Sequence, residues 1–333
     1  PEPFKIDTAC FMVNWKHVKD IRWGDKIESD GYYAQECAKG QLLKIPHFLC
    51  YYNYISGIKH PGQKEHTCTF QHQGNHGNIF FQYAFMRLFA DRYKMCSRLP
   101  LWEDSYPVDK AFLKNMFEGK LNPNGLEKIE LEIHKDRSNE LLEHTWHGIE
   151  YDNPRNFLHY WKGDAIVSSD IKLSGYFQNY ELFEDFEKVK SYFNIPQVDV
   201  KDELCINLRL GDDFKSLGLV AEPDGVLELL DKLDFNKLTI ITDVFDIGYI
   251  NNFAQYDPIV VCRDRSAPNE DFAELLQFKQ LIITNSTFSW WAAYLGNADT
   301  VYVPNDFGET SRDYCNLSKI PGKNTIEYKV NYQ

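Results

Sequence analysis

The segment from Ile282 to Leu295 constrains the fold of this chain more than any other. Its first residues predict a buried strand, its middle is a turn rich in hydroxyl groups, and its end predicts a helix that begins on that turn. A helix start attracts anions, because its first backbone N–H groups are unpaired and the helix dipole is positive there. Ser286, Thr287 and Ser289 add side-chain donors around Phe288. The segment favours a phosphate or pyrophosphate site, although an ordinary N-cap on a core helix explains the same pattern.

A second segment, from Cys205 to Asp213, combines a short apolar strand with a charged turn. Arg209 stands at the end of that strand and is followed by Gly211 and Asp212. Ligands of open parallel sheets bind at the carboxyl ends of the strands, and a guanidinium fork holds two phosphate oxygens at once. The position therefore predicts a phosphate-binding arginine. The alternative is an ion pair between Arg209 and a carboxylate such as Asp212.

The third segment, from Gly74 to Ala90, is a glycine-containing turn that opens an apolar helix. Gly74 and Gly77 permit close backbone approach, and we expect Asn78 to cap the helix. Because the helix is apolar on nearly every side, we expect it to be buried between layers. The turn lacks the glycine patterns of dinucleotide sites and of P-loops, so by itself it says little about a ligand.

Strands and helices alternate along the second half of the chain. The patterns predict strands at 204–210, 237–242, 259–262, 281–284 and 301–303 and helices at 223–233, 269–279 and 289–295. Such alternation predicts an α/β protein with a parallel sheet that is covered on both faces. Residues 1–65 are aromatic and mixed in charge and show little regular period, so we expect an N-terminal extension or stem there. Because residues 195–199 have the composition of a linker, we expect one domain at 66–197 and a second domain at 198–333.

In this order the segments resemble the α-1,2-fucosyltransferases of glycosyltransferase family 11, over residues 66–307 of this chain. The matching residues are Gly74, Gly77, Asn78, Phe81, Gln82, Tyr83 and Ala84 in a glycine motif, Gly175, Tyr176, Phe177 and Gln178 in a Gly-Tyr-Phe-Gln motif, Asn207, Arg209, Gly211 and Asp212 in a nucleotide motif, and Asn285, Ser286, Phe288, Ser289, Trp290, Trp291 and Ala293 in the last and most specific motif. Asn75, Asn207 and Leu210 depart from the family, which has Gly, His and Arg at these positions.

The resemblance implies a GT-B-like α/β fold, in which two Rossmann-like domains face a cleft. It also implies an inverting glycosyltransferase that moves L-fucose from GDP-fucose to the 2-hydroxyl of a terminal β-galactoside. The expected partners are therefore GDP-fucose and a galactose-terminated glycan. One alternative is a fucosyltransferase with another acceptor or another GDP-sugar donor. The other is a glycan- or nucleotide-binding protein without catalysis, which the departures at Asn207 and Leu210 keep open.

The segments and the resemblance together give the candidate site residues. The candidates for catalysis are Arg209, Asn78, His76 and Asp212, and the candidates for donor binding are Gly77, Asn207, Arg209, Asp243, Asp271, Ser286, Thr287, Phe288 and Ser289. Asp271 matches a carboxylate that contacts guanine in related fucosyltransferases, whereas a helix cap is its alternative. Asp243 follows a strand end and suits either a ribose contact or a structural role. His76 and Asp212 are the candidates for a general base; the alternatives are that His76 is an ordinary loop residue and that Asp212 orients the Gly211 turn or Arg209.

The leaving diphosphate gains negative charge in the transition state, and enzymes stabilise that charge with a metal ion or with fixed donors. Metal-using glycosyltransferases of the other common fold show an Asp-x-Asp motif, and no two aspartates of this chain have that spacing. We therefore expect Arg209, the hydroxyl groups of 286–289 and the helix N–H groups to act without a metal or other cofactor.

The net charge of −13 argues against a nucleic-acid partner and against attraction to anionic lipid. No apolar run is long enough to span a bilayer, and because the sequence begins at Pro1 we expect membrane attachment only through a removed N-terminal anchor. The resemblance implies a type II protein of the Golgi lumen, or a cytoplasmic enzyme if the source is bacterial.

Three further features concern the cysteines, a glycan sequon and a group of aromatic residues. Of eight cysteines, we expect Cys205 and Cys262 to be buried, and the four before residue 70 are candidates for disulfides. Asn316 begins a glycosylation sequon. Aromatic residues between 143 and 163 suit either an acceptor surface or core packing.

Overall fold

The computed structural model describes residues 67–93, 95–100, 108–117, 171–173, 175–263, 267–307 and 315–333. The chain divides into two compact units, Pro1–Gln63 and Lys64–Gln333, and every described residue belongs to the second unit. The predicted extension at 1–65, the aromatic residues at 143–163 and the disulfide candidates Cys10, Cys37 and Cys50 lie outside the described residues.

A small parallel sheet has the strand order β2-β1-β3 and consists of β1 (Thr67–Phe70), β2 (Cys96–Ser97) and β3 (Ile171–Leu173). Helix α3 (His76–Tyr93) follows β1, and α4 (Lys110–Phe117) follows β2 in the chain. As predicted, α3 is buried on nearly every side, and Phe80, Phe81 and Phe85 are fully buried. The helix begins at His76, so Asn78 lies inside the first turn and does not take the predicted capping position.

The larger sheet has six parallel strands in the order β6-β5-β4-β7-β8-β9. They are β4 (Lys201–Leu208), β5 (Leu238–Thr242), β6 (Ile259–Cys262), β7 (Phe278–Ile283), β8 (Thr300–Pro304) and β9 (Asn324–Tyr328). The chain builds outwards from β4 to β6, returns to the middle with β7 and then builds outwards on the other side. This is the strand order of a Rossmann fold, which binds ligands where the order reverses. That switch point lies between β4 and β7.

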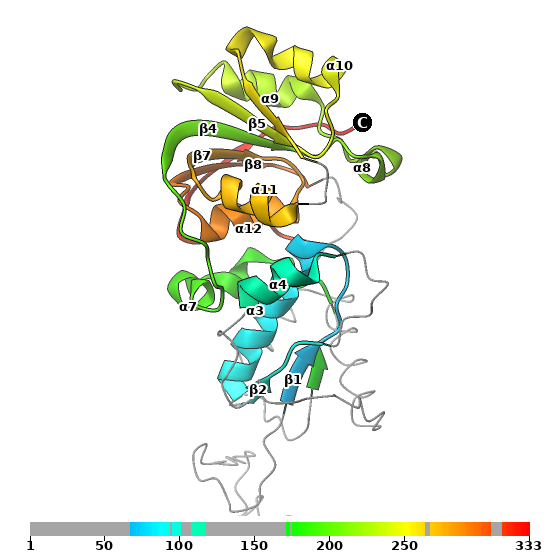
Figure 1. The fold of residues 1–333 in the computed structure, drawn as a ribbon, viewed down its shortest axis with the longest axis vertical. Coiled ribbons are helices and arrows are strands. Elements are labelled where there is room, and N and C mark those ends of the chain that lie inside the picture. The colour runs from blue at the N-terminus through cyan, green and yellow to red at the C-terminus, as the bar shows by residue number, and fades with distance from the viewer. Residues whose placement is uncertain are drawn as a thin grey trace, which may run out of the picture. The chain divides into compact units, whose positions relative to one another are not determined.

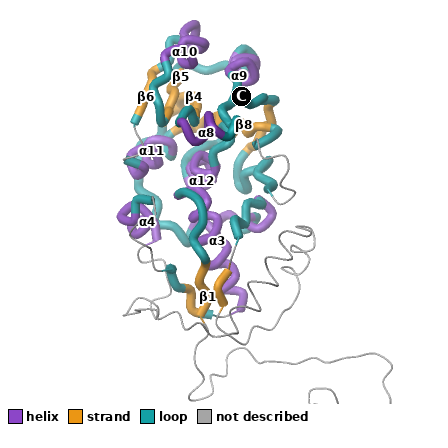
Figure 2. The backbone as a smooth tube through the Cα atoms, turned by 90° about the vertical axis from the view of Figure 1, so that its right-hand side faces the viewer, coloured by secondary structure: helices purple, strands orange, loops and turns teal. Residues whose placement is uncertain are grey.

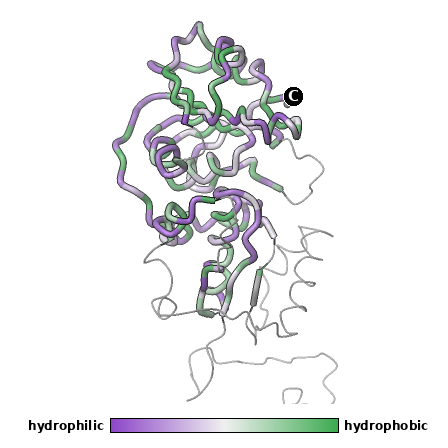
Figure 3. Tube along the Cα trace, turned by 45° about the vertical axis from the view of Figure 1, so that its right-hand side comes forward, coloured by the Kyte–Doolittle hydropathy of each residue, from purple (hydrophilic) through white to green (hydrophobic). Residues whose placement is uncertain are grey.

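Helices cover both faces of the larger sheet (Figure 1). On one face lie α9 (Pro223–Leu230) and α10 (Ile247–Ile250), and on the other lie α11 (Pro268–Leu275) and α12 (Thr287–Leu295). Because successive strand residues point to opposite faces, Ile206 joins the apolar cluster of α9 and Cys205 joins that of α12. The inner strands are buried over consecutive residues, and Figure 3 shows hydrophobic stretches (green) alternating with hydrophilic stretches (purple) along the chain. The predicted α/β class with helices on both faces of a parallel sheet is confirmed.

Helix α12 also packs against α3, the helix that follows strand β1 of the smaller sheet (Figure 2). The ring centroid of Phe81 lies 4.9 Å from that of Trp290 and 4.9 Å from that of Trp291. The hydroxyl of Tyr294 donates to the backbone oxygen of Phe183 at 2.8 Å. Aromatic contacts of this kind bury large apolar areas, so the two helices share one continuous core. The smaller and the larger sheet are therefore connected through the packing of these two helices.

Several elements differ from those that the sequence predicts. The structure adds η3 (Tyr180–Phe183), α7 (Phe186–Lys190), α8 (Asp212–Ser216), α10, η4 (Asn251–Tyr256) and β9. Most of these elements are too short to show a clear apolar period. The helix predicted for 269–279 ends at Leu275, because Phe278 pairs with Lys201 of β4 and begins β7. None of the described helices combines the length and apolar character that a membrane span needs.

Three described cysteines test the sequence predictions. Cys205 is buried, as predicted. Cys262 is exposed, which corrects the prediction, because β6 is an edge strand of the sheet and its side chains are only partly covered. Cys68, one of the four disulfide candidates, is a buried free thiol.

Candidate functional site

A pocket of about 910 Å³ lies at the carboxyl ends of β4, β5 and β7, within the size range of small-molecule sites. One wall comes from the start of α3 and the residues before α4, and the other comes from the larger sheet. Ten predicted site residues line it: His76, Gly77, Asn78, Asn207, Arg209, Asp243, Asp271, Ser286, Thr287 and Phe288. The fold therefore brings together segments that are 209 residues apart, as Asn78 and Thr287 are.

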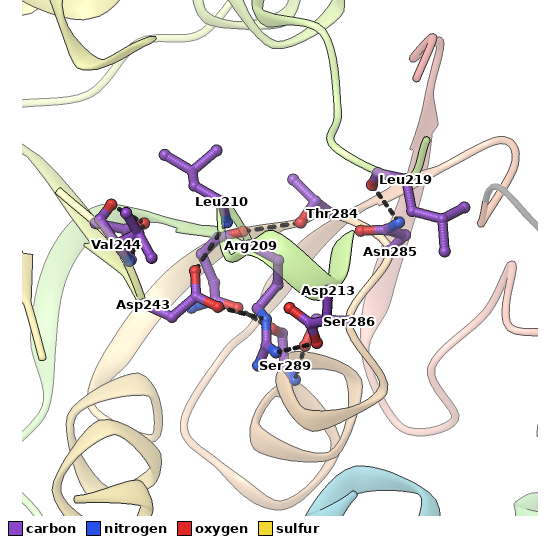
Figure 4. Close-up of polar contacts among 12 residues, drawn as sticks. Arg209, Leu210, Asp213, Leu219, Asp243, Val244, Thr284, Asn285, Ser286 and Ser289 are labelled. Atoms are coloured by element: carbon purple, nitrogen blue, oxygen red, sulfur yellow. Dashed lines mark hydrogen bonds and ion pairs between the residues drawn. The ribbon is translucent and has the colours of Figure 1, made fainter. Parts of the chain in front are cut away.

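Arg209 lies directly after β4, beside the switch point of the larger sheet (Figure 4). Its Nε is 3.2 Å from Asp243 Oδ2, and its Nη2 is 3.8 Å from Asp213 Oδ2. The ring centroid of Phe214 lies 4.8 Å from the guanidinium carbon, which is a cation–π distance. These contacts fix the guanidinium at the pocket wall. Its carboxylate partners are Asp243 and Asp213, not the Asp212 that the sequence suggested.

Two residues next to Arg209 lie elsewhere than the sequence suggested. Asp212 is the exposed first residue of α8 and does not line the pocket, whereas its neighbour Asp213 does. The reason is that the α8 turn directs only one of the two aspartates towards Arg209. The N–H of Leu210 donates to Asp243 Oδ1 at 2.8 Å, while its side chain is buried in the cluster of α9. The Leu210 position therefore adds no charge to the pocket.

The start of α12 lies next to Arg209 (Figure 4). Ser286 is the N-cap, and its Oγ accepts the N–H of Ser289 at 3.4 Å. Ser289 is fully buried and its hydroxyl donates to Asn207 Oδ1, so it supports the helix start and does not line the pocket. Asn207 Nδ2 in turn donates to the backbone oxygen of Ile241 at 3.3 Å. These bonds tie β4, β5 and the start of α12 together.

The start of α3 lies against the start of α12. A Cβ atom added to Gly77 would come within 2.4 Å of the Phe288 nitrogen and 2.5 Å of the Thr287 carbonyl carbon, so this approach requires glycine. Asn78 Oδ1 accepts the hydroxyl of Thr287 at 3.0 Å and Nε2 of Gln178 at 2.8 Å. Asn78 therefore holds three segments of the pocket wall in position.

His76 is the first residue of α3 and lines the pocket. Its Nε2 accepts the backbone N–H of Asp109 at 2.8 Å. Burial lowers the pKa of His76 to about 4, Asp109 opposes this shift and Arg209 adds to it. The imidazole is therefore neutral at neutral pH, and the hydrogen bond assigns its proton to Nδ1. Because the lone pair of Nε2 is occupied, this geometry does not favour His76 as a general base.

Asp109 also lines the pocket, although the sequence does not single it out as a site residue. Its Oδ1 accepts the N–H of Phe112 at 2.9 Å, which makes Asp109 the N-cap of α4. The sequence marks Asp109 only as an aspartate directly before a short apolar helix, and this pattern ordinarily indicates a helix cap alone. Asp109 lines the pocket because α4 begins at the pocket wall.

Tyr176 lines the same wall on a strained turn. It stands between Gly175, with a φ of 142°, and Phe177, with a φ of 52°. A non-glycine residue in the left-handed region costs of order 1 kcal/mol or more and persists only where its surroundings hold it. Phe177 is held by its stack on Phe85, with ring centroids 4.3 Å apart. The core thus fixes a turn that presents an aromatic side chain to the pocket.

Asp271 lies in the first turn of α11 and lines the pocket. Its Oδ1 accepts Nη1 of Arg263 at 3.0 Å, and Glu274 accepts Nη2 of the same arginine at 2.6 Å. Burial raises the pKa of the Asp271 carboxyl, and Arg263 opposes that shift. Ala267 occupies the N-cap position, so Asp271 is not the cap of α11. An arginine instead holds its carboxylate at the wall.

The described residues also bear on two other kinds of site, a metal site and a glycosylation site. Within the described residues, no group of three or more His, Cys, Asp or Glu side chains is arranged to hold a metal ion. Asn285 has the letters of a sequon but is 9% exposed, and its Nδ2 donates to the backbone oxygen of Leu219 at 2.6 Å. Asn316, the other sequon, is half-buried, and its Oδ1 accepts the hydroxyl of Ser318 at 3.0 Å.

Comparison with known sequences gives one extended match and several short ones. A family model described as Glycosyl transferase family 11 matches residues 36–313. Galactoside alpha-(1,2)-fucosyltransferase 1 of Bos taurus is 54% identical over 39 residues, which are 12% of this chain and 11% of that protein. The Sus scrofa protein of the same name is 50% identical over 40 residues, again 12% and 11%. The matched segment thus spans about a tenth of the length of these relatives.

Two solved structures resemble this chain with low sequence identity. NodZ alpha-1,6-fucosyltransferase soaked with GDP-fucose is 11% identical with a TM-score of 0.40, over 70% of this chain and 93% of that chain. A mutant of Arabidopsis thaliana FUT1 in complex with GDP is 11% identical with a TM-score of 0.44, over 73% of this chain and 71% of that chain.

Proposed function

Because the chain belongs to glycosyltransferase family 11, we propose that it is an inverting enzyme that moves L-fucose from GDP-fucose to the 2-hydroxyl of a terminal β-galactoside. The name of the mammalian relatives, galactoside alpha-(1,2)-fucosyltransferase 1, supports the sugar, the linkage and the acceptor. One structural observation carries the proposal: Arg209 and the start of α12 lie together at the switch point of a Rossmann-type sheet, in a pocket large enough for a sugar nucleotide.

In this proposal, the two phosphates of the donor lie between Arg209 and the first turn of α12. Arg209 is the only Lys or Arg among the described residues that line the pocket. Thr287 and Phe288 line it as well, and a helix start directs its unpaired N–H groups towards an anion. Fixed donors of this kind stabilise the charge that the diphosphate gains as its bond to fucose breaks. The arrangement supports a reaction without a metal ion.

We assign the nucleoside to the wall formed by α11 and the end of β5. Guanine presents two adjacent N–H donors, which suit a carboxylate held in place, as Asp271 is held by Arg263. Asp243, a candidate for the ribose, has both carboxylate oxygens engaged: Oδ1 by the N–H of Leu210 and Oδ2 by Arg209. We therefore propose that Asp243 orients the arginine. The fucose then points towards α3, where a terminal galactose would enter.

The proposal is tested with Arg209→Ala and Arg209→Lys in the full chain, with GDP-fucose as donor and lactose as the first acceptor. We expect kcat/KM to fall at least about a hundredfold in the alanine variant, as on removal of an oxyanion donor. The lysine variant should recover only part of it, because an ammonium lacks the planar fork. Arg92→Ala, at an exposed position of α3, is the matched control. Wild-type turnover in Arg209→Ala would exclude this role for the arginine.

The same assay separates the remaining alternatives. Transfer with another GDP-sugar, or to another acceptor only, would change the substrate and keep the site. Binding of GDP in calorimetry without any release of GDP from GDP-fucose would indicate a binding protein. We expect full activity in EDTA, and strict dependence on added manganese would contradict the metal-free mechanism. From the mammalian relatives we also propose a location in the Golgi lumen, which co-fractionation with a Golgi marker tests.

A further inference from the structure

An inverting sugar transfer has a second requirement besides the leaving diphosphate. The acceptor oxygen forms a bond to the anomeric carbon of fucose while the bond from that carbon to the β-phosphate oxygen breaks, and the electron pair leaves with GDP. The acceptor hydroxyl loses its proton in this step, so a basic group near that hydroxyl should accept it. Since attack comes from the face opposite the diphosphate, the base is expected on the wall that does not carry Arg209.

The other acidic side chains at the pocket wall are each paired with an arginine. Asp213 and Asp243 contact Arg209, at 3.8 and 3.2 Å, and Asp271 contacts Arg263 at 3.0 Å. All three belong to the larger sheet and its helices, on the side of the diphosphate. Each of these carboxylates is already held by an arginine, and all three lie on the wall that holds the leaving diphosphate in the proposed function. Because the acceptor hydroxyl attacks from the opposite side, their position does not suit the base.

Asp109 differs from them in place and in partners. It stands directly before α4, on the wall that α3 and α4 contribute. Its Oδ1 accepts the N–H of Phe112 at 2.9 Å, and among the described residues no Lys or Arg forms an ion pair with it. Its own N–H donates to His76 Nε2 at 2.8 Å, so the residue is held at both its backbone and its side chain. We infer that Asp109 is the catalytic base, whose carboxylate takes the proton of the acceptor hydroxyl.

His76 then has a supporting task. As a neutral imidazole it accepts the Asp109 N–H, and its ring makes edge contacts with Phe112 at 5.5 Å and Phe288 at 6.3 Å, centroid to centroid. Phe288 lies in the first turn of α12, which holds the phosphates in the proposed function. His76 is therefore a positioning residue that sets the acceptor wall relative to the donor wall. This inference rests on the proposed function, because it assigns one step of that reaction.

The test is Asp109→Asn, assayed in the full chain with GDP-fucose and lactose. Asparagine caps a helix as well as aspartate does, so the start of α4 is preserved, but an amide does not accept a proton. We expect kcat to fall about 10²- to 10⁴-fold. The KM for GDP-fucose, the affinity for GDP and the melting temperature should stay at their wild-type values. Asp185→Asn, which alters the N-cap of α7 away from the pocket, is the matched control and should keep wild-type kcat.

Each possible result of the Asp109→Asn assay either supports or overturns the role of Asp109 as the base. A wild-type kcat in Asp109→Asn overturns the inference and leaves the proposed function intact, provided that Arg209→Ala is inactive. A fall in kcat that is accompanied by an equal loss of GDP affinity or by a lower melting temperature assigns Asp109 a structural role and also overturns the inference. If the wild-type chain transfers no fucose to any β-galactoside, it is the proposed function that fails. A selective loss of kcat supports Asp109 as the base.

Discussion

The contact between α3 and α12 makes Gly77→Ala an informative perturbation of the site. The added Cβ would lie 2.4 Å from the Phe288 nitrogen and 2.5 Å from the Thr287 carbonyl carbon. Ordinary contacts between such atoms are about 3.5 Å or longer, so the two helix starts must separate by roughly 1 Å. Both clashing atoms belong to the backbone of α12, and no side-chain rotation can relieve them.

The expected loss of stability is modest and the expected loss of activity is large. Overpacking costs roughly 1–3 kcal/mol, and the better helix propensity of alanine offsets about 1 kcal/mol of this cost. A net cost of up to about 2 kcal/mol lowers the melting temperature of a domain of this size by at most roughly 8 °C. The same displacement moves the start of α12, which we propose to bind the phosphates, away from the start of α3. Misplacement by about 1 Å costs on the order of a hundredfold in rate, which is the expected fall in kcat/KM.

The assay measures GDP release from GDP-fucose with acceptor, alongside thermal unfolding followed by circular dichroism. Gly248→Ala in α10 is the matched control, because the nearest atom to its added Cβ is a side-chain oxygen of Asp246 at 3.4 Å. That variant should keep kcat/KM within about twofold of wild type. If Gly77→Ala keeps both its melting temperature and its kcat/KM, the close approach of the two helices does not position the site.

Two further predictions concern charges at the pocket. The unfolded chain binds a proton at His76 near pH 6.5, whereas the folded pKa is about 4, so His76 costs the wild type stability as pH falls between these values. Urea unfolding of His76→Gln should therefore show about 3 kcal/mol less acid destabilisation between pH 7 and 4 than wild type, and parallel profiles would contradict the assigned pKa. Asp213→Asn removes a partly exposed carboxylate 3.8 Å from Arg209 and should tighten GDP binding roughly two- to fivefold in calorimetry, whereas weaker binding would mean that Asp213 helps to hold the donor.

The local sequence pattern was sufficient to predict the strands of the larger sheet and the pocket residues that follow those strands. The strands predicted from 204 to 303 each appear, because a buried strand must be apolar over consecutive residues wherever it lies in the sheet. Arg209 and Ser286 are placed by the same logic, since residues that follow parallel strands gather at one edge. The resemblance to a family adds an expected role for this edge, the binding of a nucleotide sugar.

The sequence alone does not show which residues at this edge of the sheet line the pocket, because that depends on the folded structure. Sequence spacing does not distinguish Asp212 from Asp213, yet the α8 turn exposes the first and brings the second to Arg209. The sequence indicates Ser289 as a hydrogen-bond donor to a phosphate. In the folded helix, its hydroxyl is instead buried against Asn207. A single helical step of about 100° separates a side chain that lines a pocket from one that supports it.

The sequence by itself determined that this chain builds a parallel α/β sheet in which a hydroxyl-rich helix start follows one of the inner strands. Only the tertiary structure decided that His76 is neutral, that Gly77 touches α12 and that Asp109 lies in the pocket. The physical reason is the range of the interactions concerned. Periodicity and capping act over a few residues and leave a mark in the local sequence, whereas burial, close approach and the sharing of a pocket depend on contacts between segments about 200 residues apart.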